Sequence, residues 1–179
     1  MRSIVRAGLM ITTLYAVLAC ATPTTTWTSR PEAANRSTVE WVAQVRPIKM
    51  DKPFFVAFEL TVRNTSSTVL EIDWNRTRYT HNQKNSGLLV FKGIQPEALK
   101  SRTLPNEIIP PGGQMTKILS PARTIAWGKL SSKTQFNQPT FEPGILPQGN
   151  NGVSLFLIQK DRQWTQPLTV EIVAERGSE

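Results

Sequence analysis

An all-β fold, organised as a single antiparallel β-sandwich, is predicted by three features of the sequence. Apolar and polar residues alternate in several short stretches, which is the period of a half-buried strand. Turn-forming residues recur about every ten positions, and no apolar helical period extends beyond two turns. The chain has 179 residues, a length that suits one domain.

The clearest predicted strand is Phe54–Arg63. Its even-numbered positions to Val62 are apolar, and its odd-numbered positions from Glu59 are polar. Asn64–Thr68 interrupts the alternation with turn-forming side chains, and Leu70–Trp74 resumes it. We therefore expect a hairpin whose turn is Asn64–Thr68.

A second hairpin is predicted near the C-terminus. Val153–Gln159 is almost entirely apolar, and Leu168–Ala174 alternates apolar with polar residues. Between them, Asp161–Gln166 is long enough to form the reversing loop.

Weaker strands are predicted in three further stretches, each flanked by residues that interrupt a strand: Val39–Val45, Leu88–Phe91 and Met115–Leu119. Pro110–Gly113 can continue neither a ladder nor a helix. Lys129–Asn151, with three prolines, is expected to be a long excursion, and Pro96–Arg102 is the best candidate for a helical turn.

The N-terminus has the layout of a secretory signal. Arg2 and Arg6 precede the apolar run Ala7–Leu18, and no acidic residue occurs before Glu32. This run is too short to cross a bilayer, which takes ~20 apolar residues.

The segment Val17-Leu18-Ala19-Cys20 resembles the lipobox of bacterial lipoproteins. Val17 matches the aliphatic position and Ala19 the position before cleavage, while Leu18 is larger than the usual residue. The resemblance implies a signal peptide of residues 1–19 and lipidation of Cys20. The other interpretation is that Cys20, the chain's one cysteine, is a buried small hydrophobe.

Lipidation would anchor the protein to a membrane, because two or more acyl chains hold it stably. In Gram-negative lipoproteins an Asp after the cysteine favours the inner membrane, and this chain has Ala21 and Thr22 there. The resemblance therefore implies a place in the cell envelope, at the outer membrane and facing the periplasm.

Residues 20–36 are predicted to be the acylated cysteine and a flexible Thr/Pro-rich tether, because no strand or helix period is evident there. Trp27 within it has two interpretations, an anchor at the membrane interface or a side chain that folds back on the domain. Residues 37–176 then form the sandwich and 177–179 a short tail.

A looser resemblance concerns the fold alone. Val62–Asn75, followed by Ile108–Gly113, is similar to immunoglobulin-like domains of uncharacterised bacterial envelope proteins. These motifs mark strand ends, so the resemblance implies an immunoglobulin-like sandwich and no activity.

The chain is basic, with 21 Lys and Arg against 13 Asp and Glu and a formal net charge of +8. Without Arg2 and Arg6 of the signal, the charge would be +6. Outside the cytoplasm the anionic partners are lipid headgroups and cell-wall polymers, so no nucleic acid is expected. The alternative is a solvated basic face, because no run of five like charges occurs.

No catalytic or metal-binding motif is found in the sequence. His81 is the one histidine, and no nucleophile elbow accompanies it. Cys and His motifs that bind metals are absent, as are calcium loops. We therefore expect a non-enzymatic protein without a metal or cofactor.

The most suggestive polar cluster is Trp74–Asn85. Two aromatic rings, three cations and several amides gather there, a chemistry suited to a saccharide or an anionic polymer. The alternative is a core Trp74 followed by an ordinary polar loop. The candidate ligand-binding residues are Trp74, Arg76, Arg78, Tyr79, His81 and Lys84.

Two functional hypotheses follow from these features. The first is a structural or assembly module of the envelope that docks another envelope protein through an exposed edge strand. The second is a binding module for cell-wall glycan or another anionic envelope polymer, through Trp74–Asn85.

Overall fold

The computed structural model describes residues 24–91, 94, 101, 103–127 and 141–176. The signal peptide, Cys20, the C-terminal tail and nearly all of Pro96–Arg102 lie outside the described residues, as does 129–140 of the predicted excursion. The strands are β1 (Thr25–Arg30), β2 (Ala34–Ser37), β3 (Trp41–Ile48), β4 (Ala57–Asn64), β5 (Leu70–Ile72), β6 (Arg78–His81), β7 (Lys84–Asn85), β8 (Leu89–Phe91), β9 (Glu107–Ile109), β10 (Gln114–Pro121), β11 (Ile125–Trp127), β12 (Phe141–Pro143), β13 (Gly149–Gln159) and β14 (Arg162–Arg176). A 3-10 turn covers Ala122–Thr124.

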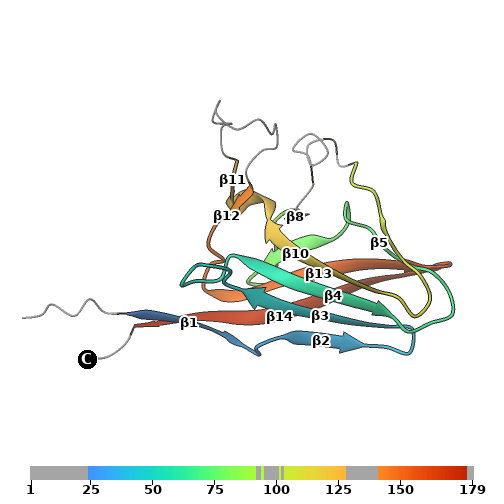
Figure 1. The fold of residues 1–179 in the computed structure, drawn as a ribbon, viewed down its shortest axis with the longest axis horizontal. Helices are drawn as coiled ribbons and strands as arrows, with labels where there is room; N and C mark the ends of the chain where they lie inside the picture. The colour runs from blue at the N-terminus through green and yellow to red at the C-terminus, as the bar shows by residue number, and fades with distance from the viewer. Residues whose placement is uncertain (1–23, 92–93, 95–100, 102, 128–140, 177–179) are drawn as a thin grey trace, which may run out of the picture.

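Two antiparallel sheets pack face to face (Figure 1), so the predicted all-β antiparallel sandwich is confirmed. Sheet A has the order β1-β14-β13-β5-β9, with β6 also paired to β13 and β7 to β6. Sheet B has the order β2-β3-β4-β10-β8, and β11 and β12 form a separate pair.

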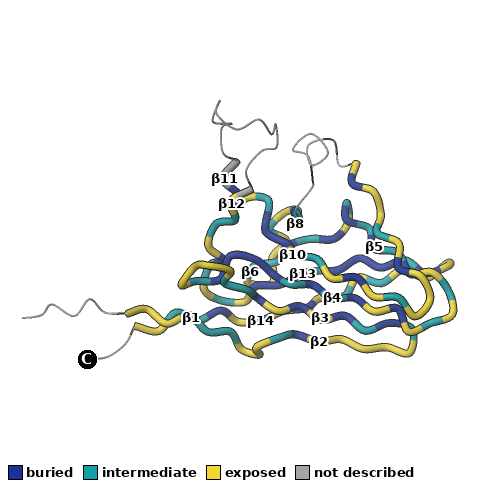
Figure 2. The backbone as a smooth tube through the Cα atoms, viewed as in Figure 1, coloured by how far each residue is buried: buried dark blue, intermediate teal, exposed yellow. Residues whose placement is uncertain are grey.

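The core lies between the inner faces of the two sheets, where the buried segments of the chain face one another (Figure 2). Its members follow the period of two that the sequence predicts. Sheet B contributes residues such as Trp41, Val45, Phe58, Leu60, Val62 and Leu119, and sheet A contributes Leu70, Ile72, Val153, Leu155, Leu157, Leu168, Val170 and Ile172.

The predicted tether is wrong within the described residues, since β1 and β2 both belong to the sandwich. Thr25–Arg30 pairs with Glu171–Arg176, and Ala34–Ser37 pairs with Val42–Val45. A run of β-branched and aromatic residues suits a strand, but its partner lies at the other end of the chain. Trp27 packs edge-on against Phe54, with ring centroids 6.4 Å apart, so it folds back on the domain.

The predicted hairpin at Asn64–Thr68 is also wrong. β4 belongs to sheet B and β5 to sheet A, so this loop carries the chain from one sheet to the other. Pro110–Gly113 makes the reverse crossing, from β9 to β10. Alternation fixes which side of a strand is buried, but it carries no information about which sheet the strand joins.

The C-terminal hairpin is confirmed, with a much shorter loop than expected. Gln159 pairs with Arg162, so only Lys160 and Asp161 form the turn, and Lys160 has a positive φ of 51°. The weaker strands are confirmed as parts of β3, β8 and β10, although Val39 precedes β3 and is 90% exposed.

Candidate functional site

The two rings of the predicted ligand-binding cluster are buried. Trp74 is 2% exposed and packs 5.0 Å from Phe91, while Tyr79 is fully buried. The Tyr79 hydroxyl donates a hydrogen bond of 2.5 Å to Asn151 Oδ1. Neither ring face is open to a sugar, so the expected stacking site at Trp74 and Tyr79 is wrong and the core alternative for Trp74 is correct.

Arg76 and Arg78 lie on the outer side of sheet A, whereas Lys84 pairs with His81 and so is on the face that Tyr79 also uses. The Arg76 guanidinium sits 3.6 Å above the ring of Phe156 and donates to Gln163 Oε1 at 3.3 Å. Arg78 donates to the carbonyl oxygens of Asn75 and Thr77. Lys84 is exposed in β7. Within the described residues, none of these three cations forms an ion pair.

His81 is at the end of β6, half-buried, with Nε2 3.0 Å from the carbonyl oxygen of Gln148. Because a carbonyl oxygen can only accept, Nε2 carries the hydrogen. The contact ties β6 to the loop before β13, which is a structural role for this side chain.

The most open feature of the backbone is one edge of β14. β14 has fifteen residues, but β1 pairs only with Glu171–Arg176. Among the described strands, none pairs with Arg162–Val170 on that side. We call Arg162–Val170 the open edge. A strand added beside it would continue the line of β1, which ends at Arg30 opposite Glu171.

The register identifies which backbone groups the open edge presents. Gln159 and Arg162 close a two-residue turn and therefore form a hydrogen-bonded pair, after which bonded and non-bonded pairs alternate. The backbone groups of Trp164, Gln166 and Leu168 consequently point to β13. Those that point outward belong to Gln163, Thr165, Pro167 and Thr169. Pro167 fits this pattern, because a proline is tolerated where no N–H is needed for the ladder.

A groove of about 430 Å³ runs beside the open edge, between β14 and β2. Its lining residues are mostly small or apolar: Pro31, Ala33, Ala34, Asn35, Arg36, Pro167, Leu168 and Thr169. Arg36 is the one charged residue of this set.

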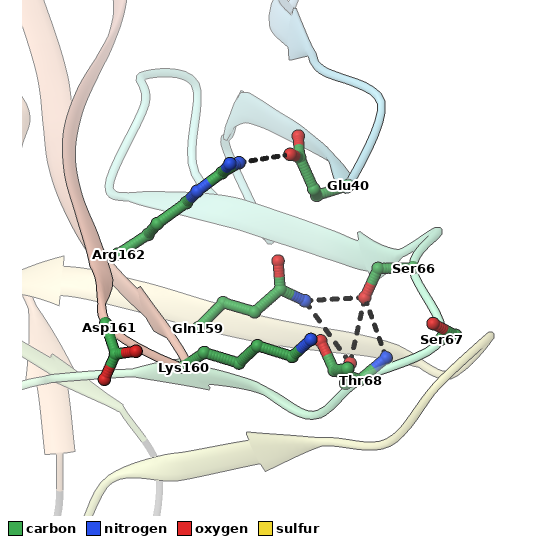
Figure 3. A pocket seen from close by; sticks show the side chains of 8 residues that line it. All are labelled: Glu40, Ser66, Ser67, Thr68, Gln159, Lys160, Asp161 and Arg162. Carbon is green, nitrogen blue, oxygen red and sulfur yellow. Dashed lines mark hydrogen bonds and ion pairs between the residues drawn. The ribbon is translucent and has the colours of Figure 1, made fainter.

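A second hollow lies at the β13–β14 turn. This turn is at the end of the sandwich away from the start of β1 (Figure 1). We call this hollow the end pocket; its volume is about 360 Å³. Figure 3 shows its lining residues, which are all polar: Glu40, Ser66, Ser67, Thr68, Gln159, Lys160, Asp161 and Arg162.

Hydrogen bonds hold the walls of the end pocket in place (Figure 3). Gln159 Nε2 donates to Ser66 Oγ at 2.6 Å and to the carbonyl oxygen of Thr68 at 3.3 Å. Ser66 Oγ also accepts from the Thr68 N–H at 3.1 Å. On the opposite wall Arg162 Nη1 is 2.9 Å from Glu40 Oε1.

In the described part of the chain, no group of three or more His, Cys, Asp or Glu side chains is placed to hold a metal ion. The same residues contain no helix long and apolar enough to cross a bilayer. No known protein family matches the chain, and neither curated proteins nor solved structures contain a significant match.

The sequence patterns predicted the residues of neither the open edge nor the end pocket. One signal for the edge is present, because Pro167 interrupts a stretch that otherwise reads as a strand and so indicates an unpaired side. For the end pocket we find no sequence signal. Glu40, Ser66 and Gln159 come from three distant segments, and only the fold brings them together.

Proposed function

We propose that this protein is a non-catalytic interaction module of the bacterial cell envelope, which binds an extended segment of another envelope protein along the open edge of β14. The observation that carries the proposal is the unpaired length of β14 from Arg162 to Val170. An exposed edge offers a row of backbone donors and acceptors, which an added strand can satisfy.

The geometry of the open edge defines the segment that would bind. It would run antiparallel to β14, in line with β1, and pair with Gln163, Thr165 and Thr169 through both backbone groups. At Pro167 it would donate only, because proline has no N–H. Where the bound segment faces the groove, its side chains must be small beside Ala33 and Ala34. Beside Arg36, an acidic side chain of the segment would form an ion pair.

The short distance between Cys20 and β1 supports an anchored position. If Cys20 is lipidated, five residue steps separate it from Thr25, the first residue of β1. An extended chain covers ~3.3–3.6 Å per residue, so β1 would start at most ~18 Å from the acylated cysteine. The domain would then be held close to the outer membrane, on its periplasmic side, with the start of β1 nearest the lipid.

Site-specific photocrosslinking in the host tests this proposal. A photoreactive residue at Thr165 or Thr169 is expected to give one discrete crosslinked protein, whose crosslinked peptide is an extended segment. Gln44, exposed on the outer face of sheet B, is the matched control position. Crosslinks of equal yield from Gln44, or none from Thr165 and Thr169, would contradict the proposal.

A second candidate function is the binding of an anionic envelope polymer through Arg76, Arg78 and Lys84. It is favoured by the Arg76 guanidinium, which Phe156 and Gln163 hold in a fixed position without an acidic partner. Because the rings of Trp74 and Tyr79 are buried, the polymer would be held by electrostatic attraction alone. Its affinity would therefore fall strongly as the salt concentration increases. Changing the three cations to glutamine should abolish low-salt binding to isolated cell wall, and unchanged binding would exclude this candidate.

A further inference from the structure

The end pocket contains one hydrogen-bond acceptor, Gln159 Oε1, to which none of the described protein groups donates. Gln159 is 6% exposed, and its Nε2 donates to Ser66 and Thr68. Because the Thr68 carbonyl oxygen can only accept, the amide nitrogen must face it. Gln159 Oε1 is left on the other side, pointing toward the Glu40–Arg162 pair (Figure 3), and none of the described groups donates to it.

Gln159 Oε1 can only accept, so it is suited to a ligand in the pocket that supplies an N–H or O–H. The partner cannot come from Ser66, whose Oγ already donates to Asn64 Oδ1 or Thr68 O. A molecule that enters the end pocket can reach Gln159 Oε1 from the open side.

The charges around the pocket balance. Glu40 and Asp161 are opposed by Lys160 and Arg162, and the Glu40–Arg162 pair, at 2.9 Å, forms the wall opposite Ser66. A ligand carboxylate would meet Glu40 and the acceptor oxygen of Gln159. A ligand ammonium would meet Arg162 and Lys160. Each ion would also meet groups of opposite charge, so neither gains a net attraction that offsets its loss of hydration, and a neutral molecule enters at lower cost.

We propose that the end pocket binds a small, neutral polyhydroxylated molecule. A hydroxyl group can donate to Gln159 Oε1, and another can accept from the free N–H groups of Arg162. The volume of about 360 Å³ lies at the lower end of the ~300–1,000 Å³ typical of ligand pockets, which suits a molecule the size of a hexitol. The end pocket shares only Arg162 with the open edge, and the ligand would use its guanidinium, whereas the strand would pair with the backbone of Gln163–Thr169.

Three probes with one carbon skeleton test the proposal: sorbitol, which is neutral; gluconate, which is an anion; and glucamine, which is a cation. Each is titrated into the 15N-labelled full chain in detergent micelles, and the side-chain amide signals of Gln159 are followed by NMR. Sorbitol is expected to shift these signals saturably, in the millimolar range. The two ions should bind roughly tenfold more weakly.

A charge change provides the decisive comparison. Glu40→Gln removes the carboxylate opposite Arg162 and leaves Gln159 in place, so gluconate should gain about tenfold in affinity while sorbitol changes little. The matched control is Glu59→Gln, which breaks the Arg46–Glu59 pair of 2.9 Å on the outer face of sheet B. That control should leave all three affinities unchanged.

Gln159→Leu removes the acceptor and should abolish the sorbitol-induced shift of the Lys160 backbone amide signal. The proposal is overturned if sorbitol produces no saturable shift, if the three probes bind equally, or if Glu59→Gln changes probe preference as Glu40→Gln does. Loss of strand crosslinking at Thr165 would leave these outcomes unaffected, so the two proposals fail separately.

Discussion

Asn64 donates a hydrogen bond of 3.0 Å from its side chain to the carbonyl oxygen of Ile109, although the two residues belong to opposite sheets. The same amide donates to Thr68 O at 2.7 Å and Pro110 O at 3.2 Å. Asn64 is fully buried, and both loops that cross between the sheets on this side converge on it. Thr68 O also accepts from Ser66 and Gln159, and Pro110 O accepts from the Gly113 N–H, so the Ile109 carbonyl oxygen depends most on Asn64.

Replacing Asn64 with alanine is expected to lower the free energy of unfolding by about 2–4 kcal/mol, because the Ile109 carbonyl oxygen loses its side-chain donor and the Ser66 N–H loses its acceptor. Chemical denaturation monitored by tryptophan fluorescence measures this change. Asn150→Ala is the control, since the Asn150 side chain is exposed, and it should stay within about 0.5 kcal/mol. Equal effects of the two substitutions would contradict the role of Asn64.

Burial raises the pKa of the Tyr79 phenol to about 12 from the ordinary 10.0, an effect that the nearby Arg123 partly offsets. The pKa of Tyr79 is higher in the folded protein than in the unfolded chain. The protonated, buried phenol therefore contributes its full stabilisation below pH 10, and this stabilisation is lost as the pH rises toward 12. The loss is on the order of 2–3 kcal/mol.

Absorbance of tyrosinate tests this prediction in a Tyr15→Phe variant, where Tyr79 is the one remaining tyrosine. Ionisation is expected near pH 12 while the protein is folded. Titration near pH 10 with the fold intact would mean that solvent reaches the Tyr79 hydroxyl.

Lipidation of Cys20 predicts a specific mass for the protein extracted from host membranes with detergent. Residues 1–19 should be missing and the mass of acyl chains should be added. The Cys20→Ala variant should lack the acyl mass and leave the membrane fraction. A wild-type protein without acyl chains would exclude the lipid anchor.

The sequence predicts well the parts of the fold that depend on local alternation. Val62 and Leu157 are buried where the period of two places them. The same pattern fails for Asn64–Thr68, because a hairpin turn and a crossing between sheets use the same turn-forming residues. The difference depends on a contact with Ile109, 45 positions away in the chain.

The candidate sites depend even more on distant contacts. Thr25–Arg30 is a strand because Glu171–Arg176 lies beside it, and the open edge exists because that pairing stops at Arg30. The sequence allowed two interpretations of Trp74, a ligand-binding ring or a core residue. The structure decides for the core, because Trp74 follows β5 of sheet A and packs against Phe91 in β8 of sheet B.

The exchange rates of individual backbone amides test the open edge most directly. In the free protein, the amides of Gln163, Thr165 and Thr169 should exchange rapidly with solvent, whereas those of Trp164, Gln166 and Leu168 should be protected by β13. Such an alternation along β14 is the result that we predict. Equal protection at all six positions would mean that the edge is already paired, and would contradict the account.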